Sequence, residues 1–252
     1  MIRRALATLL LSAWAFSAQA AAAIDALGTL QAQAASGVTS FSYTGLTSTS
    51  ASLTQGGILV FAEFYADPGV VTCVWDAAGA NQTMTQIAAV TSGPTNVNAY
   101  AKAFALIGPT SSGNKTISCS WTNGTFIGIN AVSFSGINQT SVAAAFVATT
   151  AAPAAVTTSS VTVSGATADL LFSAHSAGSS SPNCNSVSNT QWFINNSTPR
   201  TSWCANYTSG VTSAALSATW SGSQDIAVIG VDVVAYTGGG GRPPTMTLMG
   251  VD

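Results

Sequence analysis

The runs NKTISCSWT (114–122) and TFIGINAVSFSG (125–136) indicate the fold of this chain most clearly. Each run is short, rich in Ile, Val, Phe, Ser and Thr, and flanked by turn residues such as SSGN (111–114); this is typical of β-strands. Similar runs continue on both sides, from GILVFAEFYA (57–66) to DIAVIGVDVVAY (225–236), without an amphipathic helix of useful length. The sequence therefore predicts an all-β protein, an antiparallel β-sandwich.

The two halves of the sequence resemble each other. FIGINAVSFSG (126–136) aligns with VIGVDVVAYTG (228–238), SCSW (118–121) with SATW (217–220), and LVF (59–61) with LLF (170–172). We therefore predict two similar multistranded halves. The segment between them, VAAAFVATTAAPAAV (142–156), is apolar rather than linker-like, so we expect one sandwich domain over residues 37–237 rather than two independent domains.

A family resemblance adds to this prediction. The order SW-turn-FxGxxAVSFSGINQTS, a Ser/Thr strand, ADLLFSAHSAG and ATW-turn-DIAVIGVDVVAY resembles a β-sandwich domain common in secreted bacterial proteins and some phage structural proteins. The resemblance covers roughly residues 38–237 and implies a jelly-roll or concanavalin-like architecture. Such domains mostly carry no assigned activity, so the resemblance supports a fold and not a ligand.

The first twenty residues predict export. Arg3 and Arg4 precede an apolar run of about a dozen residues, and Ala18-Gln19-Ala20 supplies small side chains for signal peptidase. We expect cleavage after Ala20, with Ala22 or Ala23 as alternatives and an uncleaved anchor as the competing interpretation. Residues 21–36 are interpreted as a linker or short helical arm, and residues 238–252 as a flexible Gly/Pro-rich tail. The protein is therefore expected to be secreted, periplasmic or on the cell surface.

Charge is scarce throughout the chain. Only 6% of the residues are charged, and removing Arg3 and Arg4 leaves four basic against eight acidic residues, a net charge of −4. The remaining basic residues are scattered, which disfavours nucleic acid as a partner. No later segment is long and apolar enough to predict a membrane span. Weak electrostatic repulsion makes self-association compatible with the sequence.

The four cysteines of an exported chain are expected to pair. Cys73 and Cys119 each lie two residues before a Trp on an alternating apolar strand face, which predicts a Cys73–Cys119 bridge. Cys184 and Cys204 would then join across a Ser/Asn-rich loop. Four free thiols are the alternative. Zinc is disfavoured, because the chain has a single histidine and no Cys-x2-Cys spacing.

Catalytic chemistry has few candidates. His175, with Asp169 upstream, lacks a G-x-S-x-G elbow for a Ser-His-Asp triad, and it aligns with Phe64 of the first half. Glu63 is the only glutamate and lies within a strand-like run. The aspartates that remain for a paired-carboxylate site are interpreted mainly as turn or strand residues: Asp67, Asp76, Asp225 and Asp232. No cofactor is expected, and structural calcium at Asp67 or Asp76 is a weak alternative.

Aromatic and amide side chains supply the predicted binding site. Trp192, Trp203, Tyr207 and Asn206 lie near the cysteine-bracketed loop, and aromatic rings flanked by Asn and Ser suit uncharged glycans. We therefore expect a non-catalytic module that binds a surface glycan or protein partner, or serves as a cell-surface or particle component. The alternative is an extracellular hydrolase of glycans or polyesters.

Overall fold

The computed structural model describes residues 21–33, 37–46, 55–92, 99–178, 183–196 and 202–237. The predicted signal peptide and C-terminal tail lie outside these residues. Strands of the first half are β1 (Ala23–Leu27), β2 (Gln31–Gln33), β3 (Ser40–Tyr43), β4 (Gly57–Phe64), β5 (Val71–Trp75), β6 (Gln82–Thr83), β7 (Thr85–Thr91), β8 (Tyr100–Ile107), β9 (Ile117–Trp121) and β10 (Ile127–Ser135).

The second half follows a one-turn helix, α2 (Val142–Ala145). Its strands are β11 (Phe146–Ala151), β12 (Val156–Ser164), β13 (Leu170–Ala177), β14 (Cys184–Val187), β15 (Thr190–Asn195), β16 (Ser202–Ser209), β17 (Ser213–Gln224) and β18 (Ile226–Val233). The all-β prediction is confirmed. Within the described part of the chain, no helix has the length and apolarity needed to cross a membrane.

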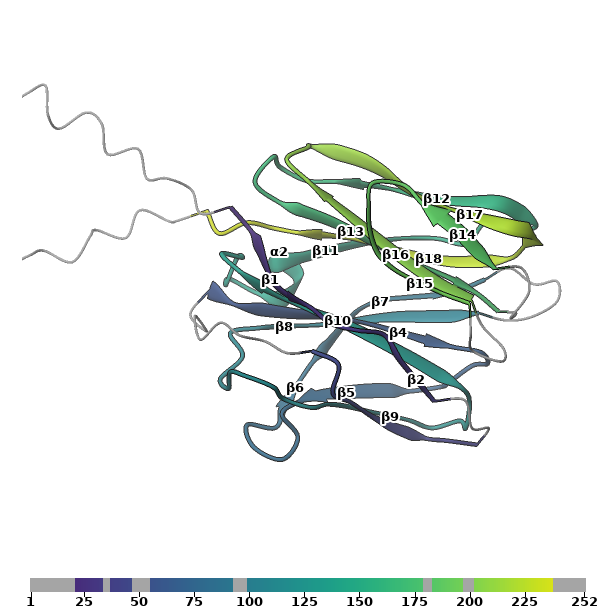
Figure 1. The fold of residues 1–252 in the computed structure, drawn as a ribbon. Coiled ribbons are helices and arrows are strands. Elements are labelled where there is room, and N and C mark those ends of the chain that lie inside the picture. Colours follow the sequence, from purple (N-terminus) through teal and green to yellow (C-terminus); the bar gives the residue numbers. More distant parts are fainter. Residues whose placement is uncertain are drawn as a thin grey trace, which may run out of the picture.

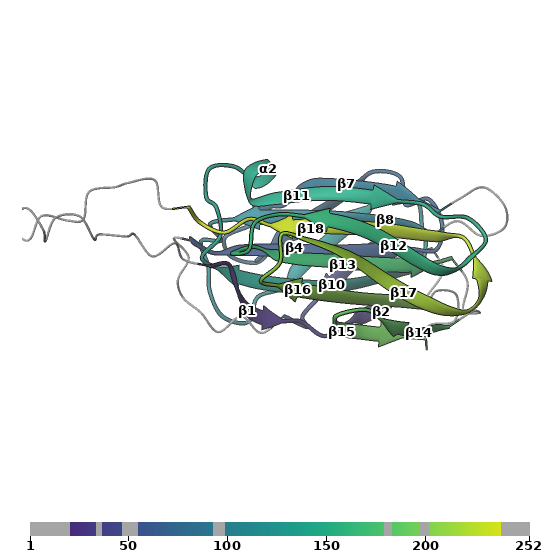
Figure 2. The ribbon, with the colours of Figure 1, turned by 90° about the horizontal axis from the view of Figure 1, so that it is seen from above.

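Each half is a sandwich of a larger and a smaller sheet. The larger sheets have the orders β1-β10-β4-β8-β7, with β2 also on β10, and β11-β18-β13-β16-β15; the smaller sheets are β3-β9-β5-β6 and β12-β17-β14. The four sheets stack as layers, with the smaller sheets outermost (Figure 1). Seen from above, their strands run in roughly the same direction (Figure 2), as in aligned sheet packing.

The halves have the same strand order. Apart from β2 and β6, each half contributes eight strands among the described residues. In both halves the larger sheet contains the first, eighth, third, sixth and fifth of these strands, in that order. The smaller sheets likewise share the order second, seventh, fourth. The prediction of two similar halves is thus confirmed at the level of topology.

The sequence alignment of β10 with β18 is wrong by one residue. Val60 of β4 pairs with Ala131, and the equivalent Leu171 of β13 pairs with Asp232, whereas the alignment matched Ala131 with Val233. A one-residue slip reverses the face of every side chain. Accordingly, a Cβ on Gly128 would point at the opposite half, and one on Gly230 would point into its own half.

Apolar side chains of the described residues form three cores. The first-half core contains Ile58 and Val60, the second-half core lies between β13 and β12-β17-β14, and the central core lies between the two larger sheets. Leu59 and Phe61, which alternate with Ile58 and Val60, face the central core. Strand β4 is therefore buried on both faces, which explains why its sequence is apolar apart from Glu63.

The N-terminal segment is extended and paired rather than a linker or helical arm. Residues Ala23–Leu27 and Gln31–Gln33 both pair with β10. Ile24 also packs against the central core. The Ala/Gln-rich composition hid this strand, because its side chains are mostly small or polar and show little alternation.

Both predicted disulfides are formed. Cys73 and Cys119 are directly opposed on β5 and β9, with Cα atoms 4.1 Å apart. Cys184 and Cys204 join β14 of the smaller sheet to β16 of the larger sheet. The second bridge thus crosses the second-half core.

Candidate functional site

The aromatic residues predicted to bind a ligand lie between the two halves. Trp192 and Tyr207 pack against the central core, and Trp203 is only 1% exposed. The Trp192 ring lies 6.2 Å from Phe61 of the first half, centroid to centroid, in an edge-on arrangement. Trp192 and Trp203 join the halves, and the prediction of an exposed sugar-stacking platform is wrong for Trp203.

Two close approaches fix this packing. The indole Nε1 of Trp192 donates a hydrogen bond to the carbonyl oxygen of Gly28 at 3.1 Å. A Cβ added to Gly128 would overlap the Trp203 ring, so this position of β10 requires a residue without a side chain.

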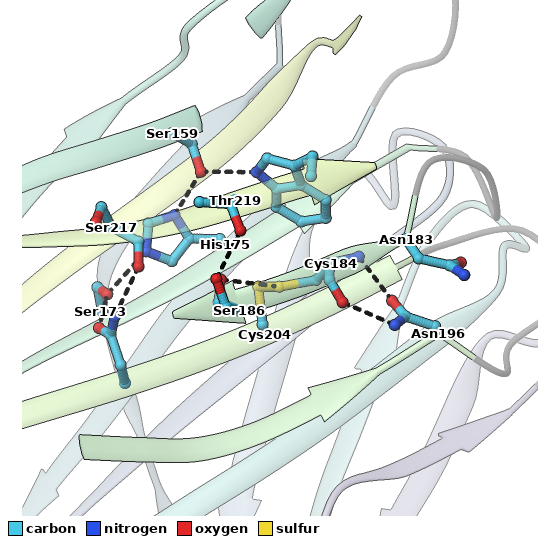
Figure 3. Close-up of a disulfide and its surroundings, with 12 residues drawn as sticks. Ser159, Ser173, His175, Asn183, Cys184, Ser186, Asn196, Cys204, Ser217 and Thr219 are labelled. Carbon is cyan, nitrogen blue, oxygen red and sulfur yellow. Dashed lines mark hydrogen bonds between the residues drawn. A yellow bond between two sulfur atoms is a disulfide. The ribbon is translucent and has the colours of Figure 1, made fainter. Parts of the chain in front are cut away.

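Asn206, the fourth predicted ligand residue, is completely buried and belongs to a network of hydrogen bonds around His175. Figure 3 shows His175 of this network between Ser159 and Ser173. Ser159 Oγ lies 2.8 Å from His175 Nδ1, and Ser173 Oγ lies 2.9 Å from Nε2. Ser173 donates to Asn206 Oδ1, and Trp220 Nε1 donates to Ser159 Oγ at 3.0 Å. Asn206 is therefore a structural residue in this chain and is not available to a ligand in solution.

The donor and acceptor roles in this series of hydrogen bonds determine the tautomer of the His175 imidazole. Because the one hydroxyl proton of Ser173 goes to Asn206 Oδ1, Ser173 Oγ must accept from His175 Nε2–H. Nδ1 then accepts from Ser159, whose oxygen accepts from Trp220. Each of these donors, from Trp220 to Ser173, therefore has an acceptor, and this arrangement requires the neutral form of His175.

His175 is not arranged as a catalytic base. Burial lowers its pKa to about 3, far below the range useful for proton transfer at neutral pH. Both ring nitrogens are occupied by serines. Asp169 instead accepts hydrogen bonds from the backbone of Ala166 and Ala235. The triad geometry therefore does not form.

Glu63 is buried at the junction of the halves. Glu63 lies on the same face of β4 as Leu59 and Phe61, which belong to the central core, and only 3% of it is exposed. Burial raises its pKa well above its usual value, an effect that the Ser176 hydroxyl of β13 partly offsets. A carboxyl group whose protonated form is favoured and which is sealed from solvent does not suit the base of a hydrolase.

The turn aspartates bind their own backbone, as the sequence predicted. Asp67 Oδ1 accepts from Gly69 N at 2.8 Å. Asp76 Oδ2 accepts from Ala80 N at 3.0 Å and lies 3.4 Å from Lys115 Nζ. The described residues contain no group of three or more His, Cys, Asp or Glu side chains that could hold a metal ion.

The late aspartates are also structural. Asp225 Oδ1 accepts from Ala155 N at 2.8 Å. Burial, and then the charge of Asp169, raise the pKa of Asp232 to about 7. The backbone of Gly165 covers Asp232 closely, since a Cβ there would lie 2.5 Å from its Oδ1.

The outer faces of the smaller sheets carry rows of hydroxyl groups that sequence analysis missed. In the second half, Ser160 pairs with Ser217, and Ser186 Oγ lies 2.7 Å from Thr219 Oγ1. We name Thr158, Ser160, Thr162, Ser164, Ser186, Ser213, Ser217 and Thr219 the second-half hydroxyl face. It presents no charged side chain, and inward residues such as Val161 and Val163 are buried beneath it.

The first half has a matching face. Ser40 and Thr72 flank Ser120 on adjacent strands, and Ser42 Oγ lies 3.5 Å from Ser118 Oγ. We name Ser40, Ser42, Thr72, Thr83, Ser118 and Ser120 the first-half hydroxyl face. The signal in the sequence was the alternation of Ser/Thr with Val, Cys or Trp, which specifies a polar outer face as clearly as an apolar inner one.

The chain thus presents two uncharged polar surfaces, while its histidine and its only glutamate are buried inside the fold. Comparisons with protein-family models, with curated proteins and with solved structures find no match to this chain.

Proposed function

We propose that this chain is an exported, non-catalytic β-sandwich module that binds neutral glycans on a surface outside the cell. The observation that carries the proposal is the pair of hydroxyl faces, one on each outer sheet. Each serine or threonine hydroxyl donates one hydrogen bond and accepts up to two, as sugar hydroxyls do. A neutral polysaccharide surface matches such a face without the desolvation of any charge.

The spacing of the rows suits an extended ligand. Neighbouring strands place hydroxyls roughly 4.8 Å apart, and alternate residues along a strand place them roughly 7 Å apart. A flat ligand can therefore meet several hydroxyls at once, so that many weak hydrogen bonds add up to useful affinity.

Two further observations support this proposal: the disulfides support export, and the strand order supports the β-sandwich architecture. Disulfides such as Cys73–Cys119 and Cys184–Cys204 persist in oxidising compartments, in keeping with the signal-like residues 1–20. The strand order places the first and last strands of each half side by side and alternates between sheets for most of its length. We interpret each half as a jelly roll on this basis.

A glycan array probed with the mature protein tests the proposal. We expect binding to neutral glycans, with weakening of at least tenfold in Thr162→Lys or Ser120→Lys, whichever face makes the contact. A lysine placed there obstructs the flat face without entering the core, because both positions are exposed. Val147→Lys, at an exposed position of the edge strand β11, is the matched control and should bind as the unaltered protein does.

Two results would contradict the proposal. One is binding that neither lysine variant weakens. The other is turnover of a polysaccharide or polyester substrate that disappears in a folded His175→Phe or Glu63→Gln variant, which would establish the hydrolase alternative.

A further inference from the structure

Charged side chains are rare enough here for each one to need a reason. The described residues include two lysines, Lys102 and Lys115. Lys115 lies against Asp76 and helps to hold its turn. Lys102 instead lines an open cavity of about 240 Å³ on the first half, together with Asp67 and Tyr100.

Strand pairing explains how this cavity forms. Tyr100 and Lys102 are two residues apart on β8 and point to the same side of the larger sheet. Their partners on the edge strand β7, Thr91 and Ala89, point the same way and are exposed. Asp67 approaches from the loop between β4 and β5. The cavity therefore has a floor of two strands and one wall made by a turn.

The polar groups of the cavity have unused hydrogen-bonding capacity. Lys102 Nζ donates to the carbonyl oxygen of Gly69 at 2.8 Å, and an ammonium group has two further donors. Asp67 uses Oδ1 for Gly69 N, and its Oδ2 accepts from no residue in the described part of the chain. Burial lowers the pKa of Lys102 and raises that of Tyr100, and the charge of Asp67 raises both. The three groups thus face one small space.

The second half closes the equivalent position. Strand pairing identifies the equivalent residues of the two halves. Lys102 pairs with Ala62, and Asn206 pairs with Ser173, the equivalent of Ala62, so Lys102 and Asn206 occupy the same position. Tyr100 and Cys204 correspond in the same way, because they pair with the equivalent residues Phe64 and His175. Asn206 donates to Ser217 O at 2.9 Å, and Cys204 is bridged to Cys184. The equivalent position is therefore filled by protein side chains in the second half. In the first half it is an open cavity with an ammonium group and a carboxylate group.

We propose that the cavity lined by Lys102, Asp67 and Tyr100 binds one neutral sugar ring. The Lys102 ammonium donates to a sugar oxygen, Asp67 Oδ2 accepts from a sugar hydroxyl, and the Tyr100 ring packs against sugar C–H groups. The opposite charges balance, which favours a neutral ligand over an acidic one. The volume is below the roughly 300–1,000 Å³ of pockets for larger molecules, which fits a single ring.

This inference rests on the proposed function and assigns one sugar unit of the same ligand. The loop that bears Asp67 leads directly into β5, whose Thr72 belongs to the first-half hydroxyl face. In this proposal, a glycan chain that lies on that face places one ring in the cavity.

Amide NMR of the full mature protein titrated with glucose, galactose and N-acetylglucosamine tests the inference. We expect shifts of the amides of Gly69, Thr91, Tyr100 and Lys102, with a Kd on the order of 1–10 mM for a single ring. Lys102→Met should weaken binding about tenfold or more, since a hydrogen bond from a charged donor is lost. Tyr100→Phe leaves the hydrogen bond from Lys102 to Gly69 in place, so it should weaken sugar binding less than Lys102→Met does. Lys115→Met is the matched control and should change nothing.

The outcomes separate the two proposals. If the protein binds array glycans while Lys102→Met binds them equally well and free sugars shift none of these amides, the cavity assignment is wrong and the proposed function stands. Preference for glucuronate or glycine over glucose would also overturn the assignment. If neither the array nor the free sugars bind, both proposals fail.

Discussion

Acid should destabilise this protein through His175. The imidazole is neutral and enclosed by Ser159 and Ser173 in the folded chain, with a pKa lowered by burial to about 3, against 6.5 for an unperturbed histidine. Between pH 6.5 and pH 3, His175 binds a proton in the unfolded chain but not in the folded chain. The free energy of unfolding therefore decreases as the pH falls. The stabilisation is complete above pH 6.5 and is lost progressively towards pH 3.

The magnitude follows from the two pKa values. Each pH unit in this window removes about 1.4 kcal/mol, so about 3 kcal/mol is lost between pH 6.5 and 4, and about 5 kcal/mol by pH 3. Asp232 and Glu63 act in the opposite sense, because burial raises their pKa values and the folded chain then binds protons before the unfolded chain does. The effect of His175 must therefore be measured as a difference between two proteins.

His175→Phe provides that difference. The equivalent position of the first half is Phe64, which packs edge-on against Trp121 at 5.5 Å, so the second half can accept a phenyl ring beside its equivalent Trp220. At pH 7 we expect the variant to be less stable by about 1–3 kcal/mol, because two serine hydroxyls lose their partner. Urea unfolding followed by tryptophan fluorescence from pH 7 to 4 should then show the two curves converging. Parallel curves over this range would refute the assignment of a neutral, buried imidazole.

Two further predictions concern packing and cross-links. Gly128→Ala should destabilise the protein by about 1–3 kcal/mol through overpacking, and thermal unfolding should show that the loss shrinks when Trp203→Leu is also present; an equal loss in both backgrounds would contradict the contact. Replacing both cysteines of Cys184–Cys204 by Ser should lower the free energy of unfolding by ~3 kcal/mol and replacing Cys73–Cys119 by ~4 kcal/mol, because the loops span 20 and 46 residues. Urea titration measures both, and a reversed order would show that core contacts of the sulfurs outweigh loop entropy.

Local pattern was enough to predict the β-structure that follows residue 37 and the two disulfides, but it did not predict β1 and β2. Alternation placed Cys73 and Cys119 on matching apolar faces, and the strands keep that arrangement. The duplication was also visible, but its register was not. The alignment of residues 126–136 with 228–238 followed identical glycines, whereas pairing with the neighbouring strand determines which face each residue occupies.

The predicted binding residues failed for a different reason. An exposed tryptophan and a tryptophan packed against a distant sheet have the same local sequence, so the position of Trp203 depends on where the first half lies. Its contact with Gly128 joins residues 75 positions apart. Conversely, Lys102 and Asp67 come from separate elements whose approach only the tertiary structure defines.

Comparison of the two halves explains how one fold carries both a rigid interior and an accessible cavity. At equivalent positions the second half has Ser173, His175 and Asn206, whose side chains bond to one another and, through Ser159 and Ser217 O, to the rest of the second half. Their polar atoms are therefore already paired within the protein. The first half has Ala62 and Phe64 in its core, so Lys102 finds no such partners and reaches instead to the rim at Gly69. A lysine near an apolar core must keep its ammonium group solvated or bound. The open cavity lets the Lys102 ammonium group contact solvent and the Gly69 carbonyl oxygen. The remaining N–H donors of Lys102 are therefore available to a ligand in the cavity.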